Sequence, residues 1–101
     1  MRVMWIREGE DPRMIDISHQ LATFQELVGG MIEVVDAFPD PMIALVCNET
    51  GRNEGEPVNR IINEHIDVCG DFFLCGQKED GSLTDFPREK EPEYDARFHL
   101  S

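Results

Sequence analysis

The sequence predicts an α+β fold of two layers, in which a mostly antiparallel sheet of about five strands carries one main helix packed on a face. Three observations lead to this prediction. Short apolar and β-branched runs recur between turn-forming residues, one segment has a helical apolar period, and residues 42–47 form a continuous apolar run of strand length. The 101 residues are enough for one modest core.

The first third of the chain predicts a hairpin followed by the helix. Residues 1–6 and 14–17 are strand-like, and the stretch 8–12 between them is rich in turn-forming residues. Ser18 is the predicted N-cap, because its hydroxyl can accept hydrogen bonds from the free amides of the next turn. A helix of about ten residues follows, with its apolar side chains on one face and a glycine at its end: Leu21, Phe24, Leu27, Val28 and Gly29.

The middle of the chain predicts a second hairpin and a polar loop. Residues 31–37 are rich in β-branched side chains, and the prolines of 38–41 force a turn before the apolar strand 42–47. The loop 48–56 follows this strand. A short helix is then predicted for 57–62, because proline is favoured at the first position of a helix.

Two further strand pieces are expected after this helix, at residues 66–68 and 71–75. Glycines follow each of them. Gly70 is expected to mark a bulge and Gly76 the end of the second piece, because glycine weakens a strand interior.

The chain is expected to form a single α+β domain over residues 1–86, in which Leu83 and Phe86 make the last contact with the core. Residues 87–101 are rich in charges and prolines, and they predict a loosely ordered C-terminal tail. One alternative stays open, since three large apolar side chains in this segment could hold it against the domain: Tyr94, Phe98 and Leu100.

Charge is the dominant feature of the composition. The net charge is −12, and −7 of it lies between residues 29 and 76. Such a field repels nucleic acid and membrane surfaces and attracts basic protein surfaces, although plain solubility explains it equally well. No apolar run approaches the ~20 residues of a membrane span. The apolar patch at residues 3–6 is too short for the apolar core of a signal sequence, and charges follow it at once. A cytoplasmic protein is therefore expected.

The three cysteines predict neither a disulfide framework nor a metal site. Cys47, Cys69 and Cys75 are an odd number and lack the close pairing of zinc ligands, even with His65 nearby. Their apolar neighbours favour buried side chains, so no cofactor is expected. A Cys47 nucleophile with His65 as base is disfavoured, because burial raises a thiol pKa. No other catalytic constellation is evident, and we expect no enzyme.

The candidate site is the polar segment from residue 48 to residue 60. Two interpretations are open for it. In the structural one, which is favoured, Asn48 and Asn59 satisfy backbone groups and Glu49 pairs with Arg60. In the functional one, the segment is a polar rim that contacts a partner or ligand through Asn48, Glu49, Arg52, Glu54, Glu56, Asn59 and Arg60.

Several ordered landmarks resemble the domain-of-unknown-function family DUF3846. They are Gly29-Gly30, Asn48-Glu49, Asn59-Arg60, Gly70 to Gly76, and Leu83-Thr84-Asp85, within a match over about residues 1–86. The resemblance implies a small cytosolic module carried largely by phages, plasmids and other mobile elements of bacteria. It implies no catalytic residues, and it leaves the tail outside the family.

Two functions are then expected. The first is a non-catalytic interaction protein that inhibits a host defence system, of the anti-CRISPR or anti-restriction type, by binding a basic surface of a host protein. The alternative is a protein that binds a small nucleotide signal, with Arg52 and Arg60 on phosphate and Trp5 or Phe38 stacked on the base. Two arginines among many acids would require a homo-oligomer for this second function.

Overall fold

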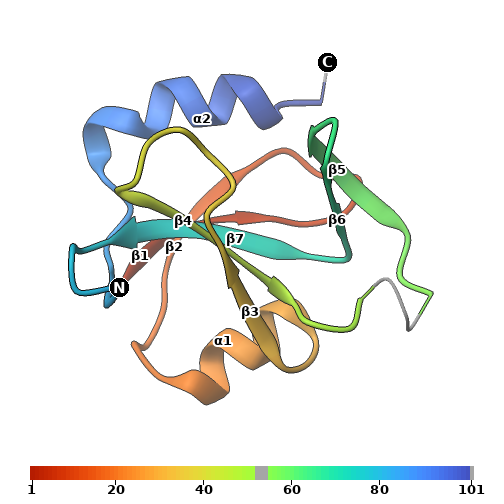
Figure 1. Ribbon diagram of the computed structural model, residues 1–101, viewed down its shortest axis with the longest axis horizontal. Helices are drawn as coiled ribbons and strands as arrows, with labels where there is room; N and C mark the ends of the chain where they lie inside the picture. Colours follow the sequence, from red (N-terminus) through yellow and green to blue (C-terminus); the bar gives the residue numbers. More distant parts are fainter. Residues whose placement is uncertain (52–54, 101) are drawn as a thin grey trace.

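Six strands form the main sheet of the computed structural model, which describes residues 1–51 and 55–100 (Figure 1). Every pairing in the sheet is antiparallel. The spatial order is β2 (Arg13–Asp16), β1 (Arg2–Ile6), β7 (Phe72–Gln77), β4 (Ile43–Asn48) and β3 (Ile32–Val35), with β8 (Leu83–Thr84) beside the end of β7. The predicted hairpins β1–β2 and β3–β4 are confirmed, and all six residues of β4 are buried.

One face of the sheet is covered by α1 (Leu21–Val28), as predicted. Phe24 and Val28 are buried there against Val3, Val46 and Phe73. Gly29 ends the helix in the left-handed region, with φ of 81°. The predicted cap is wrong, because the N-cap is Gln20 without a side-chain hydrogen bond, and the Ser18 hydroxyl instead contacts the hydroxyl of Thr23.

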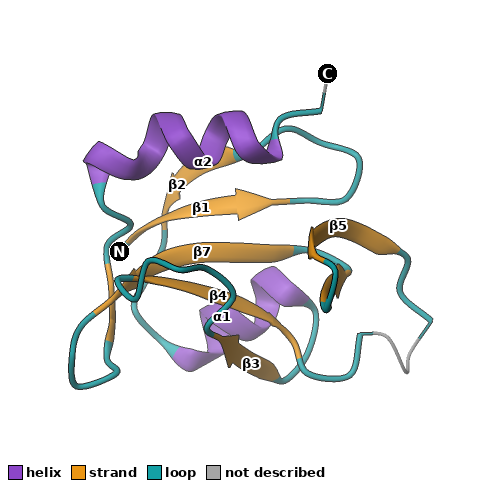
Figure 2. Cartoon of the chain, turned by 45° about the horizontal axis from the view of Figure 1, so that its top comes forward, coloured by secondary structure: helices purple, strands orange, loops and turns teal. Residues whose placement is uncertain are grey.

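The predicted α+β fold, with a mostly antiparallel sheet and a main helix on one face, is confirmed. The opposite face is also covered, by two elements that add a layer to the predicted arrangement (Figure 2). A separate hairpin of β5 (Val58–Asn63) and β6 (Ile66–Cys69) covers one part. A 3-10 turn (Arg88–Lys90) and α2 (Glu91–Phe98) cover the other. None of the described helices is long and apolar enough to cross a membrane.

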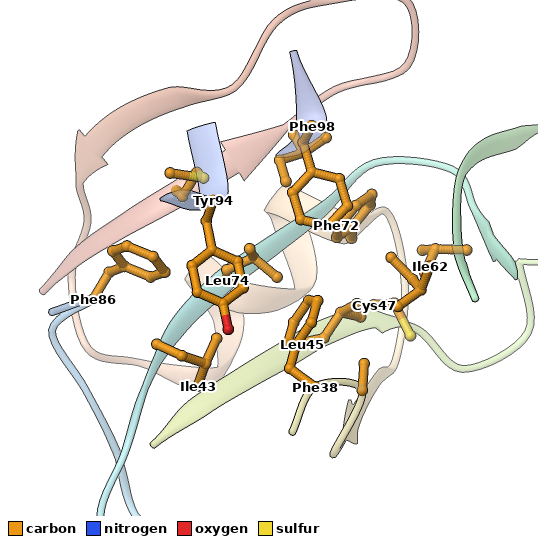
Figure 3. Close-up of a cluster of buried hydrophobic side chains, with 14 residues drawn as sticks. Phe38, Ile43, Leu45, Cys47, Ile62, Phe72, Leu74, Phe86, Tyr94 and Phe98 are labelled. Atoms are coloured by element: carbon orange, nitrogen blue, oxygen red, sulfur yellow. The ribbon is translucent and has the colours of Figure 1, made fainter. Parts of the chain in front are cut away.

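The prediction of a loosely ordered tail is therefore wrong for most of residues 87–101. Tyr94 and Phe98 are buried in the core, and each makes edge-to-face contacts with the ring of Phe38 (Figure 3). Phe72 and Phe86 complete this aromatic cluster. Pro92 stands in the first turn of the helix, where proline is tolerated because the amide it lacks would have no partner.

Two other local predictions also fail. The predicted helix over 57–62 is absent, and residues 58–62 form most of strand β5. The Asn63 side chain accepts hydrogen bonds from the amides of His65 and Ile66, which closes the turn to β6. Gly76 lies inside β7 rather than at its end. A Cβ there would lie 2.3 Å from the carbonyl oxygen of Asp85, so the neighbouring backbone requires a glycine.

Candidate functional site

Asn48 stands at the end of β4, and its buried side chain joins three parts of the chain. Its amide nitrogen donates to the carbonyl oxygen of Val28, the last residue of α1, at 3.3 Å. Its side-chain oxygen accepts from the backbone amide of Thr50 at 2.8 Å. A Cβ at Gly30 would lie 2.9 Å from the side-chain nitrogen of Asn48, so the glycine leaves the space that the Asn48 side chain fills.

Asn59 has the same role at the start of β5. Its side-chain nitrogen donates to the carbonyl oxygens of Ile6 and Gly70, both at 2.9 Å. The bond to Ile6 attaches the hairpin to the end of β1, and the bond to Gly70 ties the start of β5 to the residue after β6. The structural interpretation of the two asparagines is confirmed, because both satisfy backbone carbonyls of distant segments.

Arg60 does not pair with Glu49, which corrects the third part of that interpretation. Its guanidinium instead donates to the carbonyl oxygen of Phe98 from Nε at 3.2 Å and from Nη2 at 2.9 Å, and to that of Glu10 at 2.6 Å. Burial lowers the pKa of this guanidinium, and the nearby carboxylate of Asp11 opposes the shift. A cation at the C-terminal end of a helix is also favoured by the helix dipole.

The remaining residues of the predicted segment do not converge on one site. Glu49 and Glu56 are exposed, but they line different hollows of the surface, and Glu56 packs beside Gly70. Arg52 and Glu54 lie outside the described residues. The segment therefore supplies tertiary hydrogen bonds at Asn48, Asn59 and Arg60. Of its described residues, Asn48 and Glu49 line the largest groove discussed below.

That cavity is a groove of about 440 Å³ between the β3–β4 side of the sheet and β6, and we name it the edge groove. The sheet contributes Glu33, Val35, Leu45, Cys47, Asn48 and Glu49. The hairpin contributes His65, Ile66, Asp67, Val68 and Cys69. Its volume is at the low end of ligand pockets, which span about 300–1,000 Å³.

The edge groove has an apolar floor and an acidic rim. Leu45 and Val68 are buried in the core below the groove, and the partly buried side chain of Val35 packs against this core. The rim carries the exposed side chains of Glu33, Glu49 and Asp67. Among the described residues, neither lysine nor arginine lines the groove. The described lining of the groove is therefore negatively charged, and it suits a cationic ligand with an apolar part.

Cysteine chemistry is not favoured in the groove. Burial, followed by the nearby charges of Glu33 and Cys69, raises the pKa of the Cys47 thiol to about 11. Figure 3 shows Cys47 at the end of the core cluster, close to Ile62. The His65 side chain is 82% exposed and lies 3.3 Å from the carboxylate of Glu64. The hydrogen bond of the Cys47 thiol runs to the carbonyl oxygen of Glu33 instead, at 3.8 Å. The described residues contain no cluster of three groups that could hold a metal ion.

Sequence reasoning missed most of this groove. The sequence-based candidates included Asn48 and Glu49 but not Glu33, Asp67 or Cys69. Alternation along β3 places Glu33 on the same face as Val35, which was a usable signal. The opposite wall could not be placed, because it belongs to a hairpin that was predicted to begin with a helix.

The comparisons with known proteins identify the chain at the level of its family. A search of curated proteins and a search of solved structures found no significant match. One family model matches residues 1–99, so the segment that forms α2, which the resemblance had left outside, is within the match. The chain therefore belongs to the family described as a domain of unknown function, DUF3846.

Proposed function

We propose that this protein is a non-catalytic interaction protein that binds a basic surface of another protein. The expected setting is the cytoplasm of a bacterial host, and the expected partner is a component of a host defence system, which the protein inhibits as a phage or mobile-element product. The observation that carries the binding proposal is the edge groove, with its apolar floor and its three rim carboxylates.

Electrostatics supports this class of partner. The chain has a net charge of −12, and its middle segment holds −7 of it. Three rim residues, Glu33, Glu49 and Asp67, belong to that segment. Complementary charge raises the rate at which two proteins meet and makes this rate depend on salt. A basic cleft that normally holds nucleic acid is the most complementary surface for such a protein.

Nothing in the described residues favours nucleotide sequestration over this proposal. Arg60 was expected to contact phosphate, but its guanidinium donates to the carbonyl oxygens of Phe98 and Glu10. The carboxylates at the rim of the edge groove oppose an anionic ligand. Catalysis by the Cys47 thiol is not favoured either, since burial raises the pKa of this thiol to about 11.

Affinity capture from bacterial host lysate, followed by binding measurements with the purified partner, tests the proposal. The test variant carries Glu33→Gln, Glu49→Gln and Asp67→Asn. The matched control carries Glu79→Gln, Glu89→Gln and Glu93→Gln, which remove the same charge from exposed positions outside the edge groove.

We expect wild type and control to retain a basic partner and the groove variant to lose it. Association should slow by about tenfold or more between about 0.05 M and about 0.5 M salt, because exposed charges are screened over this range. Binding that is unaffected by salt, or equal loss in both triple variants, would count against recognition of a basic surface by the groove.

A further inference from the structure

We infer that the partner presents an extended basic segment, which pairs as an added strand with the open edge of β3 and places a long cationic side chain in the edge groove. This inference rests on the proposed function and deepens it by naming the form of the partner's binding element. Two features of the molecule meet at this place: an unpaired strand edge and an acidic groove directly beside it.

The first feature is the outer edge of β3, the last strand of the sheet (Figure 2). Within the described residues, β3 pairs with β4 and with no other strand. The carbonyl oxygen of Met31 accepts from the amide of Glu49 at 2.8 Å, and Glu33 lies opposite Cys47 in the same register. Inward and outward main-chain groups alternate in an antiparallel strand, so the N–H and C=O groups of Ile32 and Val34 point away from β4.

The second feature is the position of the groove relative to that edge. Glu33 and Val35 face the groove from β3 itself, on the side of the sheet that β6 covers. A strand that hydrogen-bonds to Ile32 and Val34 therefore sends every second side chain toward the groove. Main-chain bonds supply affinity in such a complex, and the side chains in the groove supply specificity.

Lysine and arginine match what the groove offers. Their aliphatic stems can lie on the apolar floor formed by Val35 and Leu45 while the charged head remains at the rim. In the part of the chain that the structure describes, the carboxylates of Glu33 and Glu49 have no hydrogen-bond or ion-pair partner. They are therefore available to accept charge-assisted hydrogen bonds from the incoming head group.

Charge also decides between the alternative occupants of this edge. A second copy pairing through β3 would bring two acidic rims together, and like charges opposite one another destabilise a strand pair. Nucleic acid is disfavoured for the same reason. Glu33 resembles the charged residues with which natural edge strands prevent self-association, and this protection does not extend to a strand of opposite charge.

The test uses the full chain labelled with ¹⁵N and a short probe peptide in which lysine alternates with threonine. An arginine–threonine peptide is the second probe, and a glutamate–threonine peptide is the charge control. A lysine–threonine peptide N-methylated at alternate residues keeps the charge but cannot form the strand ladder. We expect shifts at Ile32, Glu33 and Val34 with the basic peptides only, and affinity about tenfold or more lower after N-methylation, since ladder hydrogen bonds are lost.

Two variants separate the strand edge from the groove. Val34→Pro removes an outward amide without touching the ladder to β4, because proline is tolerated where a strand N–H faces solvent. It should abolish peptide binding, whereas Val34→Thr should not. Glu33→Gln and Glu49→Gln should each weaken the lysine peptide by about two- to fivefold, and Glu79→Gln should leave it unchanged.

The outcomes distinguish this inference from the proposed function. If neither basic peptide shifts β3 at millimolar concentration, or if the N-methylated peptide binds equally well, strand addition is wrong. The protein could still capture its partner in a salt-dependent way, which would leave the proposed function standing. If a purified basic partner binds and Val34→Pro has no effect on that binding, the partner uses another surface. Failure to retain any basic partner contradicts the proposed function itself.

Discussion

The two helices cover opposite faces of the same sheet, and they are held there by similar contacts. Each has eight residues and buries two side chains four positions apart, Phe24 and Val28 in α1 and Tyr94 and Phe98 in α2. In each, a polar side chain from a neighbouring strand binds the carbonyl oxygen of the last residue. They differ in sequence context, since α1 lies between the strands it covers and α2 follows all of them.

The difference shows what positions a short helix when its own pattern is weak. The apolar spacing of α1 can be read locally, because Leu21 and Leu27 extend the stripe formed by its buried residues. In α2, the residues between Tyr94 and Phe98 are Asp95, Ala96 and Arg97, and acids occupy its first turn. Its position therefore depends on distant contacts, and these contacts can be removed one at a time.

The largest effect is expected from removing one buried aromatic ring of each helix. Phe24→Ala and Phe98→Ala should each lower the free energy of unfolding by about 3–5 kcal/mol, because each leaves a cavity in a packed core. Urea denaturation of both variants measures this. A loss within about 0.5 kcal/mol for Phe98→Ala alone would mean that α2 is not docked, as expected for an ordinary surface site.

A smaller effect is expected from the cation that holds the end of α2. Arg60→Met keeps an aliphatic stem but removes the donors to the carbonyl oxygens of Phe98 and Glu10. The free energy of unfolding should fall by about 1.5–3 kcal/mol, the range for hydrogen bonds that involve a charged group. Arg13→Met is the control, because Arg13 is exposed and has no contact of this kind among the described residues. Equal stability of the two variants would show that Arg60 does not hold α2.

Asn48 provides the corresponding test for α1. In Asn48→Asp the shape is kept, but a carboxylate cannot donate to the carbonyl oxygen of Val28. The free energy of unfolding should fall by about 1–2 kcal/mol at neutral pH. Amide hydrogen exchange should speed up at the C-terminal end of α1 and stay unchanged in α2. Faster exchange in both helices would mean that α1 and α2 do not open independently of each other.

The smallest effect is expected at Asp40, whose ion pair with Lys90 joins the turn before β4 to the 3-10 turn that precedes α2. Its carboxylate accepts from the amide of Met42 at 2.9 Å and lies 3.1 Å from the ammonium of Lys90, and these two contacts lower its pKa from 3.8. A lowered pKa in the folded state adds stability above pH 3.8 that is lost as the pH falls through the folded value.

Thermal unfolding of wild type and Asp40→Asn across the acid range checks this prediction. Wild type should have the higher melting temperature at neutral pH, and the two curves should converge below pH 3.8. Asp36→Asn is the comparison variant, because its carboxylate is exposed and has no contact of this kind among the described residues. A constant difference at every pH would show that the ion pair with Lys90 does not contribute.

The sequence was sufficient for elements whose evidence lies within a few residues. The β1–β2 and β3–β4 hairpins, α1 and its Gly29 end followed from apolar period and turn residues. The β5–β6 hairpin was misread because Pro57 favours a helix start as readily as the residue before a strand. The edge groove was missed as a whole, since its two walls meet only through tertiary packing.

In the polar segment, residue types could be given a role from the sequence, but their bonding partners could not be identified. Asn48 and Asn59 were correctly given structural roles, because asparagine often bonds to backbone groups. Their partners are 20 and 53 residues away, at Val28 and Ile6. No local pattern identifies such partners, and for the same reason the pairing of Arg60 was wrong.

The contacts around α2 also have a consequence for how the chain folds. Arg2 pairs with Glu91, and the amide of Leu100 donates to Asp11 at 2.8 Å, so the helix is held by residues about ninety positions earlier. Contacts of such separation slow folding, because a large loop must close before they form. During synthesis, the face that α2 covers stays open until residues 91–100 leave the ribosome. Until then Phe38, Phe72 and Leu74 have only part of their cover, and this interval is when the nascent chain is most exposed to aggregation and to chaperones.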